Sequence, residues 1–329
     1  MDFLAALKIA RDFIITDGVL VKYMGSDDIV HIPENVKIIG SKAFYDNKKI
    51  REVYLPKNLE IIQKYAFQGC GYLDKVHFNN NLREIEKCAF ANTNLKEANL
   101  PDTITFLGLG VFADSSLQST CFPKSLNYIP SAAFAHTPLS EVIIPEHITS
   151  IHPSAFKDCP FLKKVILPEN LKDLGQDFGD QVRPGSVFKN CTALTEITIP
   201  ENIEVLYRRT FEGCKKLEQV NFVGQRLQEI QNNCFAGCDN LKKITLPTCK
   251  HIEESAFSNV EDTILSTAEF GIQIFCDNET LKNSPKFAAR FKNNINQYVK
   301  SLDVLIDAKM SLRQINELIT SNEDRFYER

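Results

Sequence analysis

Hydrophobic and polar residues follow one another along this chain in a pattern that recurs about every 22 to 24 residues. The clearest mark of the repeat is Ala-Phe, or a close variant, whose phenylalanines are Phe44, Phe67, Phe90, Phe112, Phe134, Phe156, Phe188, Phe211, Phe235 and Phe257. Their successive spacings are 23, 23, 22, 22, 22, 32, 23, 24 and 22 residues. A fixed period of this length is the sequence signature of a solenoid, in which each coil contacts only its neighbours. We therefore predict ten stacked coils with the phenylalanines in a common core.

Each repeat also contains a segment of the form Leu-x-x-Val-x-Leu-Pro, which alternates with a period of two. Val165 and Leu167, for example, are expected to face the core while Lys164 and Ile166 face solvent, as in a strand with one buried face. Proline ends the strand because it cannot donate to a strand ladder. It stands at Pro33, Pro56, Pro101, Pro123, Pro145, Pro168, Pro200 and Pro247, and two repeats have Asn79 and Val223 instead. Ala-Phe then lies on the limb that returns from the strand.

The two ends of the chain depart from the repeat. Residues 1–28 are expected to form an N-terminal cap, made of a short helix and a β-hairpin around Asp17-Gly18. Residues 29–276 form the solenoid. Residues 277–329 are expected to form a C-terminal helical cap and tail, because Ser284-Pro285 is a helix-start signal and apolar residues follow at spacings of three and four. The tail could seal the solenoid, or pair with another chain and make an oligomer.

One repeat carries an insertion at residues 175–186. The proline and the phenylalanine of a repeat are 11 residues apart in most repeats, but 20 residues separate Pro168 from Phe188. The inserted residues are rich in glycine and polar side chains, which predicts a loop. Such loops are either tolerated without a function or recruited for binding. If this loop binds a partner, its candidate residues are Asp177, Phe178, Asp180 and Arg183.

The repeated Ile-x-x-x-Ala-Phe-x-x-Cys-x-x-Leu-x-x-Val-x-Leu-Pro units resemble the BspA-like, or Treponema-type, leucine-rich-repeat family over about residues 29–257. The entry segment around Asp17-Gly18-Val19-Leu20 is part of the resemblance. The resemblance implies a curved solenoid with parallel strands on one face and short irregular returns on the other. It also implies adhesion or protein binding, often at a cell surface. We thus expect an α/β solenoid: a leucine-rich-repeat superhelix of about ten repeats, with an N-terminal hairpin cap and C-terminal helices.

Composition narrows the class of partner and the compartment. A net charge of −4 without a basic stripe makes nucleic acid an unexpected partner. Five of the ten cysteines occupy one repeat position, three residues after the phenylalanine: Cys70, Cys159, Cys191, Cys214 and Cys238. Other repeats place Asn, Thr, Ser or Val there, so we interpret the position as a slot for a small residue and expect reduced thiols. With no membrane span or recognisable signal, we expect a cytoplasmic protein; the alternative is a surface protein, or one secreted by a non-standard route.

No catalytic, cofactor or metal site is expected. Gly108-x-Gly110-x-x-Ala113 matches a dinucleotide fingerprint, and Asp177-Phe178-Gly179 a kinase motif, but neither has the required context. Cys234, Cys238, Cys249 and His251 invite a zinc interpretation, yet they lack paired spacing and Cys238 already belongs to the packing slot. The six histidines do not fall with any nucleophile or carboxylate at one repeat position.

The outward position of the strands gives a candidate binding surface. Its residues are Tyr54, His77, Asn99, Cys121, Ile143, Ile166, Thr198, Asn221 and Thr245. Because stacked strands lie about 4.8 Å apart, Cys121, Ile143 and Ile166 are expected to form an apolar stripe with a polar rim, as at protein interfaces. The alternative is that isoleucine is simply a good strand former.

The pattern favours a non-enzymatic scaffold that binds a protein partner through its strand face, at Tyr54, His77, Asn99, Cys121, Ile143, Ile166 and Thr198. One alternative is an exported or surface adhesin of the same fold. Another is an enzyme or assembly module that uses the 175–186 loop and the C-terminal helices.

Overall fold

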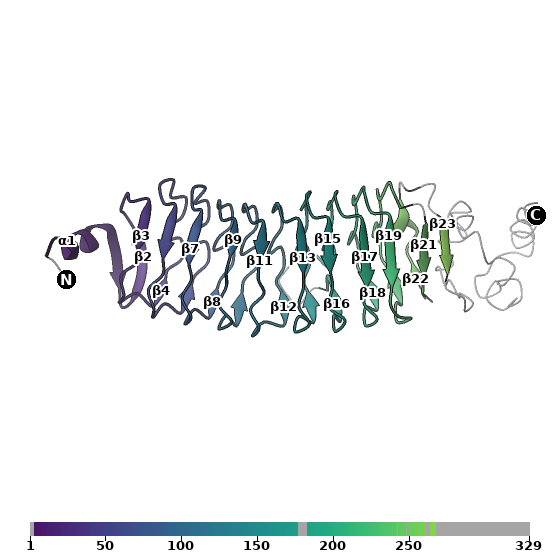
Figure 1. Ribbon diagram of the computed structural model, residues 1–329, viewed down its shortest axis with the longest axis horizontal. Coiled ribbons are helices and arrows are strands. Elements are labelled where there is room, and N and C mark those ends of the chain that lie inside the picture. The colour runs from purple at the N-terminus through teal and green to yellow at the C-terminus, as the bar shows by residue number, and fades with distance from the viewer. Residues whose placement is uncertain are drawn as a thin grey trace, which may run out of the picture.

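The computed structural model describes residues 3–176, 183–241, 243–247, 249, 251–258, 260 and 264–267. They form a long stack of coils with α1, Phe3–Asp12, at its N-terminal end (Figure 1). The expected C-terminal helices lie outside the described residues. The division of the chain into regions 1–28, 29–276 and 277–329 stays a prediction.

The strand face is the surface built from the first strand of each coil. Its strands are β3 Ile29–His31, β5 Glu52–Tyr54, β7 Lys75–His77, β9 Glu97–Ala98, β11 Ser119–Thr120, β13 Glu141–Ile143, β15 Lys164–Ile166, β17 Glu196–Ile199, β19 Gln219–Phe222, β21 Lys243–Leu246 and β23 Ile264–Thr267. They pair in parallel within the groups β3-β5-β7, β9-β11, β13-β15, β17-β19 and β21-β23. The register is that of the repeat, since Val30, Val53 and Val76 are opposite one another.

A second row of parallel strands lies on the return limbs, and we call this surface the second face. Its strands are β2 Val19–Tyr23, β4 Ile38–Ile39, β6 Ile61–Ile62, β8 Glu84–Ile85, β10 Phe106–Leu107, β12 Tyr128–Ile129, β14 Ser150–Ile151, β16 Asp173–Leu174, β18 Val205–Leu206, β20 Glu229–Ile230 and β22 His251–Ile252. They pair within β2-β4-β6-β8-β10, β12-β14-β16 and β18-β20-β22. The protein is therefore a parallel β-solenoid of about ten coils.

The α/β assignment was wrong. Besides α1, the described residues contain a single further helix, the four-residue 3-10 helix η1, Glu254–Phe257. The return limbs are also not irregular, because they carry the second face. The physical reason lies at the corner around Ala-Phe, where two residues of each coil from Phe44 to Phe235 have left-handed backbone. In one coil these are Tyr65 (φ 64°) and Gly69 (φ 77°), two positions before and after Phe67. A right-handed helix cannot pass through such residues.

The N-terminal segment closes the first coil with a hairpin. β1, Phe13–Thr16, pairs antiparallel with β2, which then pairs in parallel with β4. The Tyr23 ring lies 5.0 Å from the Phe44 ring, and Phe13 lies 5.0 Å from Tyr23. The hairpin thus covers the first ring of the core with two further aromatic rings.

The ten phenylalanines form one continuous stack through the core. Neighbouring ring centroids are 4.7 to 5.9 Å apart and their planes are 4 to 14° from parallel. Every ring is at most 2% exposed. A ladder of backbone hydrogen bonds runs beside the rings, as when Phe67 N–H donates to Ala89 O at 2.8 Å. Stacking and this ladder together fix the spacing of the coils.

The cysteine slot beside the stack is a hydrogen-bonding position. Each of its five thiols donates to the carbonyl of the phenylalanine one coil earlier; Cys70, for example, donates to Phe44 O at 3.1 Å, and the others to the equivalent carbonyls at 3.1 to 3.2 Å. Burial raises the pKa of Cys70 and of Cys238 to about 12. Cys70 and Cys238 therefore stay protonated at neutral pH. Their thiols add a second hydrogen bond to carbonyls that already accept a backbone N–H, as Phe44 O does from Asn47 at 3.0 Å.

Truncation of a ring in the middle of the stack is expected to destabilise the protein strongly. Phe134→Ala removes a side chain that is 1% exposed and stacked on both sides, so the free energy of unfolding should fall by about 3–5 kcal/mol. Phe161→Ala is the matched control, because this ring is 60% exposed and its loss should cost less than about 0.5 kcal/mol. Chemical denaturation measures both, and equal losses would contradict the stack.

The buried thiols predict alkaline destabilisation. Burial raises the pKa of Cys70 and of Cys238 in the folded chain, so the unfolded chain releases thiol protons that the folded chain retains. The free energy of unfolding should therefore fall as the pH rises above about 9. The variant Cys70→Ala with Cys238→Ala should show a shallower fall, measured by urea denaturation at pH 7 and pH 10. A slope equal to that of the wild type would show that these thiols do not contribute.

Candidate functional site

Two isoleucines form the centre of the apolar surface on the strand face. Ile143 of β13 and Ile166 of β15 are opposite each other in a parallel pair and are 67% and 42% exposed. The residues two positions earlier, Glu141 and Lys164, are likewise opposite each other and exposed. The structure thus brings together an apolar pair and an oppositely charged pair on one surface.

Cys121 belongs to this surface only at its margin. Its sulfur accepts a hydrogen bond from Leu100 N–H at 3.2 Å and donates to Ala98 O at 3.4 Å. Its sulfur thus contacts the backbone of the preceding coil, while the residue is exposed beside Ile143 in the repeat. The three-residue stripe of Cys121, Ile143 and Ile166 stays a prediction.

A groove continues the apolar pair on the other side. It encloses about 610 Å³ between the coils of β15, β17 and β19, and its lining includes Ile166, Thr198, Pro200 and Val223. Val223 is 67% exposed and stands where most repeats have the strand-ending proline. The groove lies where β15 and β17 are not paired in one sheet. Sequence reasoning noted the missing proline at Val223 but not its place beside Ile166.

The remaining strand-face candidates make a polar, partly aromatic region toward the N-terminal end. The Tyr54 ring stacks on His31 at 4.4 Å and on His77 at 3.9 Å. Glu52 accepts hydrogen bonds from Tyr54 Oη at 3.0 Å and from His77 Nε2 at 2.5 Å, and these bonds lower the pKa of its carboxyl group. Asn99 is exposed singly, whereas Thr198 lines the groove. Tyr54, His77 and Asn99 lie on the same face as Ile143 but do not line the groove.

The insertion leaves the coil on the second face. Gly185 N–H donates to Gly175 O at 2.7 Å and so closes the base of the loop. Gly185 has φ +91°, and a Cβ there would lie 2.0 Å from Arg208 O, so the closure requires glycine. Arg183 is exposed and follows β16, away from the strand face. Asp177, Phe178 and Asp180 lie outside the described residues.

The cysteine-based zinc hypothesis finds no matching geometry among the described residues. Cys238 is buried in the slot and donates to Phe211 O at 3.2 Å, and Cys234 is also buried. Gly108 likewise serves packing, because a Cβ there would lie 2.3 Å from the backbone nitrogen of Lys87.

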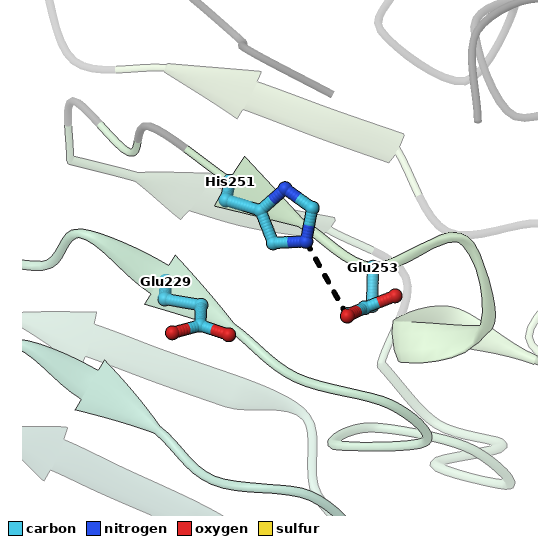
Figure 2. A group of neighbouring side chains, drawn as sticks. All are labelled: Glu229, His251 and Glu253. Carbon is cyan, nitrogen blue, oxygen red and sulfur yellow. Dashed lines mark ion pairs between the residues drawn. The ribbon is translucent and has the colours of Figure 1, made fainter. Parts of the chain in front are cut away.

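His251 nevertheless lies with two carboxylates on the second face. In the part of the chain that the structure describes, one group has metal-ligating geometry: Glu229, His251 and Glu253 (Figure 2). The statement that no histidine shares a repeat position with a carboxylate was therefore wrong, since β20 and β22 place Glu229 opposite His251. Both residues stand six positions before the phenylalanine of their repeat, and aligning that position would have found them.

This fold defines the chain as a leucine-rich-repeat solenoid. Residues 26–118, 97–178 and 184–287 match the family described as BspA type leucine rich repeat region, in six copies. The chain belongs to this family.

The chain is similar to several solved structures of leucine-rich repeat proteins. A leucine-rich repeat protein from Bacteroides ovatus is 19% identical, covering 81% of this chain and 91% of its own, with a TM-score of 0.44. One from Eubacterium ventriosum is 18% identical, covering 78% and 85%, with a TM-score of 0.47. A leucine rich cell surface protein from Faecalibacterium prausnitzii is 18% identical, covering 78% and 92%, with a TM-score of 0.35. No curated protein matches the chain. Among the described residues, no helix is long and apolar enough to cross a membrane.

Proposed function

We propose that this protein is a non-enzymatic scaffold that binds a protein partner on its strand face, at the surface formed by Ile143, Ile166 and the groove beside them. Membership of the leucine-rich-repeat family supports a role in protein interaction. The observation that carries the proposal is the pair of exposed isoleucines next to a groove of about 610 Å³. Exposed apolar patches with a polar rim are typical of protein-binding sites.

The chemistry of the surface favours a partner segment with apolar side chains flanked by charges of both signs. Val223 and Pro200 extend the apolar lining of the groove beyond Ile166. Glu141, Lys164 and Glu196 are exposed on three neighbouring strands and alternate in sign. An apolar side chain of the partner would fill the groove, while its charged residues would pair across the rim and set the register.

We also propose that the scaffold works where thiols stay reduced. Four of the five slot cysteines, Cys159, Cys191, Cys214 and Cys238, stand in consecutive coils and donate to backbone carbonyls. Oxidation would remove these donors from a buried ladder, and free thiols persist chiefly in reducing compartments. The cytoplasm meets this condition.

Charges placed on the isoleucine pair are expected to remove partner binding while the fold persists. A photo-reactive amino acid at position 143 should cross-link the partner, which mass spectrometry identifies. The purified partner should then bind the variant Ile143→Asp with Ile166→Asp at least about tenfold more weakly, or about 1.4 kcal/mol, by calorimetry.

The matched control is Ile29→Asp. Ile29 is 47% exposed on β3 of the same face, several coils before Ile143 in the stack. It should leave the affinity within about twofold of the wild type. Unchanged melting temperatures would show that the variants are folded. Undiminished binding by the folded double variant would exclude the surface as the partner site.

A further inference from the structure

We propose that Glu229, His251 and Glu253 bind a divalent transition-metal ion, of the class to which Zn²⁺ belongs, on the second face. The cluster lies toward the C-terminal end of the described stack, on a different face of the coils from Ile143 and Ile166. It is thus a second site, independent of the proposed partner surface.

The repeat geometry brings the three side chains together. Glu229 begins β20 and His251 begins β22, and the two residues are opposite each other in a parallel pair. Glu253 comes two residues after His251 and so points to the same face. Figure 2 shows the three side chains converging, with His251 Nε2 3.4 Å from Glu253 Oε1.

The spacing of the ligand atoms suits a single ion. One atom from each side chain lies within 4.8 Å of the other two. Around a tetrahedral Zn²⁺ with bonds of about 2.1 Å, ligand atoms are about 3.4 Å apart. Binding would therefore require these half-buried side chains to rotate so that their ligand atoms move closer together.

Among the residues that the structure describes, no basic side chain balances the charge of the cluster. Within the described residues, no lysine or arginine forms an ion pair with Glu229 or Glu253. Elsewhere the protein does balance such groups, since Glu212 pairs with Lys189 at 3.2 Å and with Arg209 at 3.3 Å. A divalent cation between two carboxylates and an imidazole would provide the missing charge. Gln231 donates to Glu229 Oε1 at 3.2 Å and orients that carboxylate.

The donor set determines the class of ion. One imidazole nitrogen with two carboxylate oxygens suits Zn²⁺ and its first-row neighbours, whereas Ca²⁺ and Mg²⁺ prefer oxygen ligands alone. The nearby thiol of Cys249 is buried and donates to His251 O at 3.2 Å, so it is engaged with the backbone and is not one of the three converging side chains. Three protein ligands leave a fourth position for water. The bound ion would join two neighbouring coils across β20 and β22.

Titration of the purified chain with Zn²⁺ tests the proposal. Calorimetry should give one strong site per chain, and Glu229→Gln and His251→Gln should each weaken it by at least about tenfold. The matched control is Glu84→Gln, because Glu84 is half-buried and begins β8 of the same face. This control should keep the wild-type affinity. Zn²⁺ should also raise the melting temperature of the wild type and of the control only.

The same titration distinguishes the cluster from the cysteines. Co²⁺ bound by nitrogen and oxygen gives weak visible bands, whereas thiolate ligands add intense near-ultraviolet bands. Wild-type affinity in folded Glu229→Gln, thiolate bands, or no binding at millimolar Zn²⁺ would each overturn the proposal. If His251→Gln does not fold, Glu229→Gln and Glu253→Gln, which keep the size of the side chain, decide the outcome.

Discussion

Contact between successive coils is the constraint on which the rest of this structure depends. A coil has too few residues to bury its own phenylalanine, so each ring is covered by the rings before and after it, 4.7 to 5.9 Å away. Backbone hydrogen bonds also depend on a neighbouring coil, because donors such as Phe67 N–H have their acceptors one coil later. Stability in such a stack is the sum of each repeat and its two interfaces. The first interface has no preceding repeat, and Tyr23 and Phe13 take its place.

The corners of the coil explain how the stack tolerates an irregular repeat. Left-handed residues before and after the phenylalanines from Phe44 to Phe235 turn the chain sharply, so extra residues can leave and return without moving the ring. Gly185 N–H closes the insertion on Gly175 O, and Phe156 and Phe188 remain stacked at 5.7 Å across it. On the strand face, the coils on either side of the insertion are not held by strand pairing, since β15 and β17 do not pair in one sheet. The groove beside Ile166 lies at that interruption.

The sequence predicted the features that recur at every repeat. Phe134 and Cys191 could be placed in the core because ten copies of one pattern fix their position. Ile143 and Ile166 could be placed side by side because the period sets the register. The second face was missed because all its strands after β2 have two residues, as at Ile61–Ile62, which is too short for alternation to show.

The left-handed corners were also missed, although the one that follows the phenylalanine carries a signal: in nine coils it is glycine, asparagine, aspartate or histidine, as at Gly69 and Asn190. The corner before the phenylalanine carries none, since residues as different as Tyr65 and Arg209 adopt it, and there the turn imposes the conformation. The cluster of Glu229, His251 and Glu253 is a different case. Its members share the register of β20 and β22, so an alignment of return limbs, and not only of strands, contains it.

The two surfaces differ in how far a ligand on each could act. A solenoid transmits stability mainly to adjacent coils. An ion held between β20 and β22 would therefore stiffen those coils and leave the coils of β13 and β15 nearly unchanged. A partner bound at Ile143 and Ile166 would contact the coils of β13 and β15. No strand pairing connects β15 to β17 at the groove. The strand face could thus bind a partner while an ion on the second face stabilises the coils of β20 and β22, because the two sites are built on different coils.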